Sequence, residues 1–240
     1  MPYRSDPARP STRTTPDGRP MADVRSYARR GSRLTPQQQA TWNRRAGQWL
    51  LPGTVVTEGL DLPRWFGREA PLIVEVGSGV GETVAALAAR RPAYDVLAVE
   101  VWRPGLASTF VHLEQAGVSN VRALALDAAW VLEHLVGDAA VAELWTFFPD
   151  PWPKVRHHKR RLVDPGFAAL AASRLSSGAA WRLATDWPDY AARMAEVLDA
   201  EPRLEGGVTD RWEERPITRF ERRGLAAGRP VTDLCYRRVG

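Results

Sequence analysis

The chain has 240 residues, of which 44% are hydrophobic and 25% are charged, and its formal net charge is +5. A single cysteine, Cys235, excludes an intramolecular disulfide framework, and no apolar run approaches the ~18 residues that a membrane-spanning helix needs. This length and composition suit one α/β domain, alone or with a tail. The first residues lack the apolar stretch of a secretory signal, so we expect a cytoplasmic protein with no membrane partner.

The amino-terminal part of the chain is basic and poor in apolar residues. Residues 1–33 hold the whole formal charge excess, whereas the charges of residues 34–240 balance. We therefore expect a disordered basic extension over residues 1–24 and a folded domain over residues 25–240. The extension is either a solvated tail or an arm that adds non-specific affinity for RNA phosphates.

The rest of the chain alternates between apolar strands and amphipathic helices. A first helix is expected to begin with Thr35 as its N-cap and Pro36 at its first position. Short apolar runs predict strands at residues 71–76, 95–100, 121–126, 142–148, 179–184 and 231–239. Helical spacing predicts helices at residues 82–90, 104–116, 128–135, 167–175 and 189–198. This alternation indicates a mostly parallel sheet with helices on both faces, which binds ligands at the carboxyl ends of its strands.

A glycine-rich segment follows the first expected strand. Glycines at positions 77, 79 and 81 permit a tight turn and a close approach of a ligand to the backbone. A nicotinamide or flavin fingerprint needs Gly or Ala at position 82, where this chain has glutamate. The spacing therefore favours a nucleoside ligand without a pyrophosphate, and S-adenosylmethionine is the obvious candidate.

Acidic residues lie at the ends of the first three expected strands. Glu75 precedes the glycine loop, Glu100 closes the second strand and Asp127 follows the third. A carboxylate at Glu100 can accept hydrogen bonds from ribose hydroxyls, and one at Asp127 can accept from an adenine amino group. Asp127 is equally well placed to be the N-cap of the next helix. Together the acids predict a rim that suits a cationic sulfonium and repels phosphates.

The fourth expected strand runs into the most informative stretch of the chain. Two prolines flank Asp150, which stiffens its backbone, and the neighbouring aromatic residues can stack on a base. The segment that follows has no acid between residues 151 and 163 and contains both lysines of the protein. Its five basic residues are Lys154, Arg156, Lys159, Arg160 and Arg161. They predict an RNA-phosphate surface, with a solvated basic loop as the alternative. We expect no metal site, because the adjacent side chains of His157 and His158 diverge.

The run Phe148-Pro149-Asp150-Pro151-Trp152-Pro153-Lys154 with His157-His158-Lys159-Arg160-Arg161 closely resembles the signature of tRNA (guanine-N7-)-methyltransferases of the bacterial single-chain type. Other segments resemble the same family in the right order, and the resemblance covers about residues 25–238. These segments are residues 25–35, 66–71, 184–190, 218–224 and 233–234.

This resemblance implies a Rossmann-like class I methyltransferase fold with a seven-stranded, mostly parallel sheet. It implies methyl transfer from S-adenosylmethionine to N7 of guanosine 46 in the variable loop of tRNA, by a monomer or homodimer without an obligatory protein partner. The cofactor site is expected to comprise Glu75, Gly77, Gly79, Glu100, Asp127 and Asp150. Asp150 matches the family's proposed catalytic residue. The family's substrate-contact positions are matched by Lys154, Asp186, Thr218, Arg219, Phe220 and Glu221.

Three other functions remain as alternatives. The Pro-Asp-Pro-Trp loop is reminiscent of methyltransferases that act on an amino group of a nucleobase or protein, although the basic run favours tRNA. The chain could also be a non-catalytic RNA-binding module that keeps this fold. A nicotinamide oxidoreductase ranks last because of Glu82. Departures from the family pattern are modest and fall at Ser78, at Trp102-Arg103 and at Pro153.

Overall fold

A computed structural model describes residues 33–240 of the chain. The expected basic extension over residues 1–24 and the family-like segment at residues 25–30 lie outside the described residues. Among the helices that are described, none is long and apolar enough to cross a membrane.

Seven strands form a single sheet in the order β3-β2-β1-β4-β5-β7-β6. The first five strands in the chain pair in parallel, while β7 lies antiparallel to both β5 and β6. The strands are β1 Leu72–Val76, β2 Asp95–Val99, β3 Val121–Leu124, β4 Val141–Phe147, β5 Leu175–Thr185, β6 Leu204–Thr209 and β7 Thr232–Arg238. The expected mostly parallel, seven-stranded sheet is therefore confirmed.

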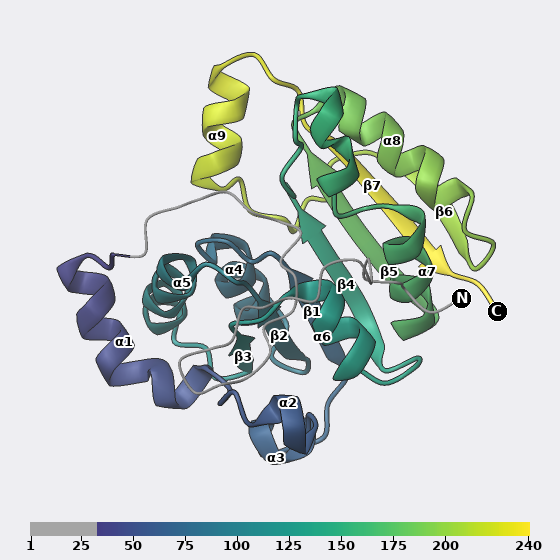
Figure 1. Ribbon diagram of the computed structural model, residues 1–240. Helices are drawn as coiled ribbons and strands as arrows, with labels where there is room; N and C mark the ends of the chain where they lie inside the picture. Colours follow the sequence, from purple (N-terminus) through teal and green to yellow (C-terminus); the bar gives the residue numbers. More distant parts are fainter. Residues whose placement is uncertain (1–32) are drawn as a thin grey trace.

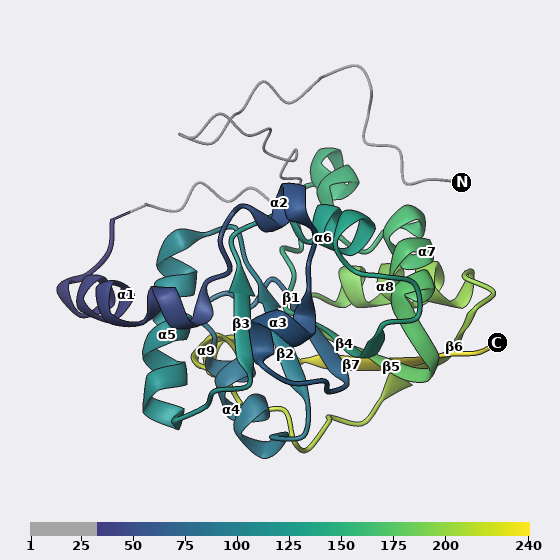
Figure 2. The same cartoon turned by 90° about the horizontal axis from the view of Figure 1, so that it is seen from below.

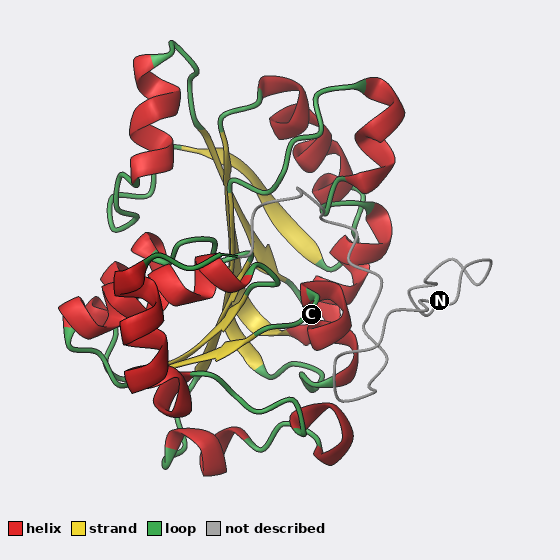
Figure 3. Cartoon of the chain, turned by 60° about the vertical axis from the view of Figure 1, so that its left-hand side comes forward, coloured by secondary structure: helices red, strands yellow, loops and turns green. Residues whose placement is uncertain are grey.

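The helices cover the sheet on both faces, as the edge-on view in Figure 3 shows. They are α1 Pro36–Trp49, α2 Val55–Glu58, α3 Leu62–Phe66, α4 Glu82–Arg90, α5 Arg103–Ala116, α6 Ala128–His134, α7 Pro165–Arg174, α8 Pro188–Asp199 and α9 Arg219–Ala226, with a 3₁₀ helix η1 at Val155–Arg160. Helices α1, α4 and α5 lie on one face and α6, α7 and α8 on the other (Figures 1 and 2). Side chains of β1 contribute to both hydrophobic cores. Val74 and Val76 belong to the core under α6–α8, and Ile73 belongs to the core under α4 and α5. Burial on both faces explains why the parallel strands are mainly apolar rather than alternating.

Helix α9 stands apart from the other helices in Figure 1, and an irregular segment covers the sheet beside it. Trp212 in this segment packs against Trp145 and Phe147 of β4, with ring centroids 6.1 and 6.3 Å apart. The guanidinium groups of Arg182 and Arg91 lie over its indole at 4.2 and 5.3 Å. Trp212, with two guanidinium groups over its ring, thus packs against the core that Trp145 and Phe147 share with α4 and α5.

The structure confirms some of the predicted element bounds and changes others. Thr35 and Gln38 form a complete capping box at the start of α1, which confirms that helix start. Strand β5 begins at Leu175 rather than at residue 179, because Val141 pairs with Leu175 and Glu143 with Ala180, so that the intervening residues bulge. Strand β3 ends at Leu124, two residues before the predicted end. The sequence reading did not find α2, α3, η1, β6 or α9 as elements.

Candidate active site

The turn between β1 and α4 is a glycine loop held against α5. Gly77, Gly79 and Gly81 all have φ in the left-handed region, at 71°, 58° and 81°. A Cβ on Gly81 would lie 2.6 Å from the backbone of Thr109, and a Cβ on Gly105 would lie 2.4 Å from the carbonyl oxygen of Gly79. The loop therefore needs glycine both for its own conformation and for the close approach of α5.

Glu100 ties the end of β2 to this glycine loop. One carboxylate oxygen accepts a hydrogen bond from the backbone N–H of Gly79 and the other accepts from Trp102, both at 2.8 Å. The two bonds fix the orientation of the carboxylate at the carboxyl end of the sheet. They also give Trp102, a departure from the family pattern, a backbone role at the start of α5.

Glu75 is a buried carboxyl group at the end of β1, with 3% of its surface exposed. Burial, and then the negative charge of Glu100, raises the pKa of Glu75 to about 8. Its Oε2 atom and the hydroxyl of Ser78 have no hydrogen-bond partner among the described residues. Buried polar atoms are normally paired, so these two atoms point to a ligand that supplies the missing partners.

Asp127 lies at the end of the third strand and serves as the N-cap of α6. Its carboxylate accepts a hydrogen bond from the backbone N–H of Trp130 at 3.0 Å. The structure therefore confirms the alternative that Asp127 is the N-cap of the helix that follows it. A carboxylate has further acceptor positions, so the predicted contact to an adenine amino group stays a prediction.

Asp150 lies in a strained turn at the carboxyl end of β4. Phe148 and Trp152, one on each side of it, have φ values of 51° and 46°, which bulky residues rarely adopt. The backbone N–H of Phe148 donates to the carbonyl oxygen of Ala184 at 2.7 Å, which anchors the turn to β5. The indole N–H of Trp152 is buried without a partner among the described residues. Strain and an unpaired donor in one turn indicate a functional rather than a purely structural segment.

The basic segment after this turn forms η1 and separates into two groups. Lys154, Arg156, Lys159 and Arg160 are exposed, as expected for residues that bind phosphates. Arg161 differs, because it is buried and donates to the carbonyl oxygen of Pro151 at 2.9 Å and to the carboxylate of Asp189 at 2.5 Å. Its guanidinium also lies over the ring of Tyr190 at 4.8 Å. The structure thus places Arg161 as an anchor between η1 and α8, whereas the sequence grouped it with the phosphate-binding residues.

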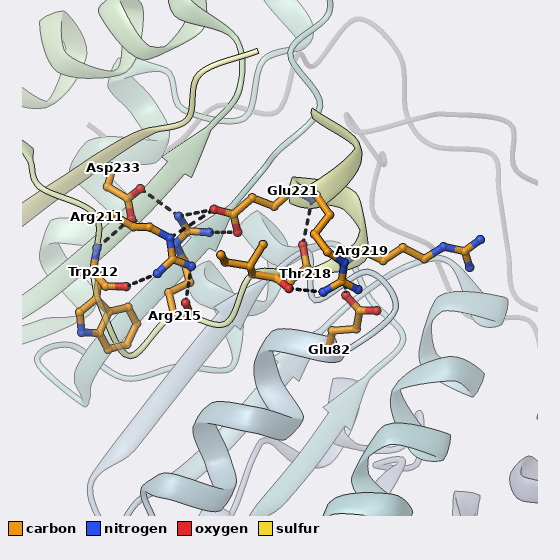
Figure 4. A network of polar contacts seen from close by, with 10 residues as sticks. Glu82, Arg211, Trp212, Arg215, Thr218, Arg219, Glu221 and Asp233 are labelled. Carbon is orange, nitrogen blue, oxygen red and sulfur yellow. Dashed lines mark hydrogen bonds and ion pairs between the residues drawn. The ribbon is translucent and has the colours of Figure 1, made fainter. Parts of the chain in front are cut away.

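The carboxyl-terminal motif brings α9 to the glycine loop and to the Asp150 turn. Thr218 caps α9, and the backbone N–H of Arg219 donates to the carboxylate of Glu82 at the start of α4 (Figure 4). Phe220 is half exposed and its ring lies 5.4 Å from that of Phe148. Of the predicted substrate positions in this motif, Arg219 thus contacts the start of α4 and Phe220 contacts the start of the Asp150 turn.

The two predicted substrate carboxylates, Asp186 and Glu221, are buried and paired. Asp186 accepts a hydrogen bond from Arg229 at 2.8 Å. Glu221 is 1% exposed and binds Arg215 through both of its oxygens. Sequence reasoning singled out neither arginine, because arginine is so frequent in this chain that its presence carries no signal. Within residues 33–240, no three His, Cys, Asp or Glu side chains gather as a metal ion would require.

The strand order, the glycine loop after β1 and the carboxylates at the ends of β1 and β2 define a class I S-adenosylmethionine-dependent methyltransferase. A family model described as "Putative methyltransferase" matches residues 69–234, more than half of the chain. Among solved structures, a 16S rRNA (adenine(1408)-N(1))-methyltransferase from Catenulisporales acidiphilia superimposes with a TM-score of 0.52 at 14% identity, over 75% of this chain and 92% of that one. At that identity the likeness concerns the fold alone.

Curated proteins of similar sequence identify a narrower family within this class of methyltransferases. A protein of a Nocardioides species named "tRNA (guanine-N(7)-)-methyltransferase" is 59% identical over 235 residues, which cover 98% of this chain and 95% of that protein. A Cutibacterium acnes protein of the same name is 50% identical over 90% of this chain and 83% of its own length. The chain belongs to the tRNA (guanine-N(7)-)-methyltransferase family, which confirms the resemblance seen in the sequence.

Proposed function

We propose that the protein transfers a methyl group from S-adenosylmethionine to N7 of guanosine 46 in the variable loop of tRNA. One observation supports this proposal above the others. Because β4 lies beside β1 in the sheet, the Asp150 turn at its carboxyl end follows the edge that carries Glu75 and Glu100 and leads into the exposed basic residues at η1. A cationic cofactor suits the acidic side and an RNA backbone suits the basic side, and Asp150 lies between the two.

The residues at the ends of β1 and β2 fit S-adenosylmethionine. Oε2 of Glu75 and the hydroxyl of Ser78 are buried and unpaired among the described residues, so they can receive polar groups of the cofactor. Glu100 is held by two backbone donors in an orientation from which it can also accept ribose hydroxyls. When bound, the cofactor supplies the methyl group on a positively charged sulfur.

The exchange Gly105→Ala tests the glycine loop and is expected to weaken S-adenosylmethionine binding about tenfold or more. The added Cβ would lie 2.4 Å from the carbonyl oxygen of Gly79. Because this oxygen belongs to the backbone, the contact can be relieved only if the glycine loop shifts. Calorimetric titration with the cofactor measures the change. Gly47→Ala in α1 is the matched control, because a Cβ there meets no atom within 4 Å. Equal cofactor affinity in Gly105→Ala and Gly47→Ala would contradict the placement of the cofactor on this loop.

The chemistry of guanine N7 decides what the protein must do. N7 carries a free lone pair and no hydrogen, so no general base is needed before it accepts the methyl group. The purine becomes positively charged, and a nearby carboxylate stabilises that charge. Asp150 suits this role, or it can hold the N1–H and amino edge of the guanine. The base must leave its stack to reach the site, and the rings of Trp152 and Phe220 are the nearest candidates for holding it.

The exposed residues of η1 are expected to bind phosphates without reading the sequence. Replacing both Lys154 and Lys159 by alanine should weaken tRNA binding and lower the slope of log affinity against log salt by about 1–2, because each phosphate contact contributes ~0.7–0.9. Filter binding at several salt concentrations measures the slope. Arg237→Ala is the control, since Arg237 is exposed on β7 near the amino-terminal half of β5. An unchanged slope in the lysine variant would remove η1 from the RNA interface.

The reaction itself is tested with purified protein, tritiated S-adenosylmethionine and unmodified tRNA, with and without a guanosine at position 46. Aniline-induced cleavage of the product reports N7-methylguanosine. We expect incorporation and cleavage only when guanosine 46 is present. Incorporation without cleavage would move the acceptor to another atom, and cofactor binding without incorporation would indicate a binding-only role or a missing partner. Because the assay contains only this chain, it also tests the expectation that no other protein subunit is needed.

A further inference from the structure

Arg215 is fully buried between two carboxylates, as Figure 4 shows. Its terminal nitrogens donate to the two oxygens of Glu221 at 2.7 and 3.2 Å. Nε and one terminal nitrogen donate to the two oxygens of Asp233 at 3.1 and 2.9 Å. Arg211 adds a second positive charge, with its Nε 3.4 Å from Glu221 and its terminal nitrogen on the carbonyl oxygen of Arg215. The two positive charges of the cluster balance its two negative charges. Arg215 binds each carboxylate through two hydrogen bonds, a bidentate geometry for which the planar guanidinium of arginine is suited.

The guanidinium of Arg215 also contacts the end of β4. It lies 5.3 Å from the ring centroid of Phe148 and 5.7 Å from that of Phe147. One side chain therefore joins three elements that are far apart in sequence, namely β4, α9 through Glu221 and β7 through Asp233. A buried cation with paired carboxylates and aromatic faces holds such elements in one arrangement.

Each element held by Arg215 leads to the reacting centre. Phe148 is the left-handed residue two positions before Asp150, so its placement sets the start of the strained turn. Phe220 in the first turn of α9 packs on Phe148, and Arg219 binds Glu82 beside the glycine loop. The space between α9 and the Asp150 turn thus depends on the geometry around one guanidinium.

We propose that Arg215 is a positioning residue for methyl transfer, which fixes α9 and Phe148 relative to each other and so places the target base beside Asp150. This inference rests on the proposed function. It gives Glu221 a definite role, because both oxygens of its carboxylate bind Arg215 and so tie α9 to the cluster. We expect cofactor and phosphate binding to be separate from this role, since Glu75 and Glu100 lie at the ends of β1 and β2 and the exposed basic residues lie at η1, whereas the cluster joins β4, α9 and β7.

The exchange Arg215→Lys tests the proposal, because lysine keeps the charge and loses the planar fork. We expect kcat to fall at least about tenfold, while the Kd for S-adenosylmethionine and the KM for tRNA stay within about threefold. Arg203→Lys is the matched control, since Arg203 pairs with Glu201 beside the start of β6, away from the carboxyl ends of the parallel strands. Wild-type kcat in Arg215→Lys would overturn the proposal.

A second variant separates positioning from stability. Arg215→Met combined with Glu221→Gln and Asp233→Asn removes the buried charges together, which is expected to retain most of the Tm that Arg215→Met alone would lose. In this triple variant we expect kcat to stay low although the protein is folded. If kcat recovers together with the Tm, the cluster serves folding alone and the inference is wrong.

Hydrogen exchange gives a readout that does not depend on activity. In Arg215→Lys we expect faster amide exchange in both residues 147–150 and residues 219–226, with unchanged exchange in α4. Faster exchange in α9 alone would show that Phe148 is not held by Arg215. Failure of the proposed function is distinct, because the wild-type protein would then form no N7-methylguanosine whatever the exchange data show.

Discussion

Replacing Asp150 by alanine is expected to lower kcat for tRNA methylation about 10²- to 10³-fold while the protein stays folded. The carboxylate lies in a turn strained by Phe148 and Trp152, where the acidic edge meets η1. In the proposed mechanism, removal of the side chain takes away either the negative charge that would stabilise the methylated, cationic guanine or the acceptor that would hold its edge. Single-turnover methylation at saturating cofactor and tRNA measures the change, with circular dichroism as the check on folding.

The exchange Asp150→Asn separates charge from position. Asparagine keeps an acceptor oxygen of similar shape but lacks the charge. If Asp150 mainly stabilises the cationic product, Asn should lower kcat nearly as much as Ala and leave the KM for tRNA unchanged. If it mainly holds the guanine edge, Asn should also raise the KM for tRNA, because its NH2 group is a donor that would face a donor of that edge.

Asp138→Ala is the matched control, because Asp138 is exposed and precedes β4 at the opposite end of the same strand, where it pairs with Arg174. Its kcat should equal that of the wild type. Turnover near the wild-type rate in Asp150→Ala would sink the assignment of Asp150 as the catalytic residue.

The parallel half of the fold could be predicted from sequence because each strand there is buried on both faces. Every residue of β1 and β2 is buried, so the strands are mainly apolar runs, with Glu75 and Asp95 as their only charged residues, and turn residues bound them. The carboxylates that we propose to bind the cofactor close these strands, and the position of Glu75 and Glu100 follows from strand ends alone. The glycine loop is likewise a local feature, since three left-handed residues at alternate positions require glycine.

The antiparallel half gave a weaker signal, although β7 was predicted at residues 231–239 and is confirmed at Thr232–Arg238. Only Leu204 of β6 is buried, and Gly206 and Gly207 weaken the strand pattern, so β6 depends on pairing with β7. Helix α9 leaves Phe220 and Leu225 about half exposed, and therefore lacks the buried stripe of an ordinary surface helix. Long-range pairing and ion pairs hold these segments, and neither is visible as a period in the sequence.

The buried ion pairs were the least predictable part of the site. The sequence placed Glu221 and Asp186 in family-like motifs. It did not indicate that Arg215 would pair with Glu221 and Arg229 with Asp186. Nor could it separate Arg161, which is held by Asp189, from the four exposed basic residues beside it. Each of these pairings joins residues on different elements, so only the tertiary structure decides which charges meet.

The buried carboxyl of Glu75 is expected to make the stability of the cofactor-free protein fall as the pH rises from 5 to 8. Burial and Glu100 raise the pKa of Glu75 to about 8, above its ordinary value of 4.5. Below pH 4.5 both the folded and the unfolded chain carry the proton. Above that pH the unfolded chain releases it while the folded chain retains it, so the free energy of unfolding falls until the pH passes about 8. The loss is on the order of 3–5 kcal/mol for this group.

Urea denaturation of the wild type and of Glu75→Gln at pH 5 and pH 8.5 measures this loss as the difference between the two proteins. The glutamine variant should be nearly insensitive at this site and should be the more stable of the two at pH 8.5. Glu114→Gln is the control, because Arg44 and Arg45 lower the pKa of Glu114 to about 2 and its ionisation is constant above pH 5. Identical pH dependence in the wild type and Glu75→Gln would show that Glu75 is not protonated in the folded state.

The same titration predicts how the cofactor binds. A cationic sulfonium favours the ionised form of Glu75, so affinity for S-adenosylmethionine should rise as the pH increases towards 8, and binding near pH 7 should release a proton. The released proton appears as a dependence of the calorimetric binding enthalpy on the ionisation enthalpy of the buffer. Glu75→Gln should bind the cofactor more weakly and abolish this dependence, whereas Glu114→Gln should keep both. Proton release that persists in Glu75→Gln would assign it to another group and leave the charge at Glu75 without a role in cofactor binding.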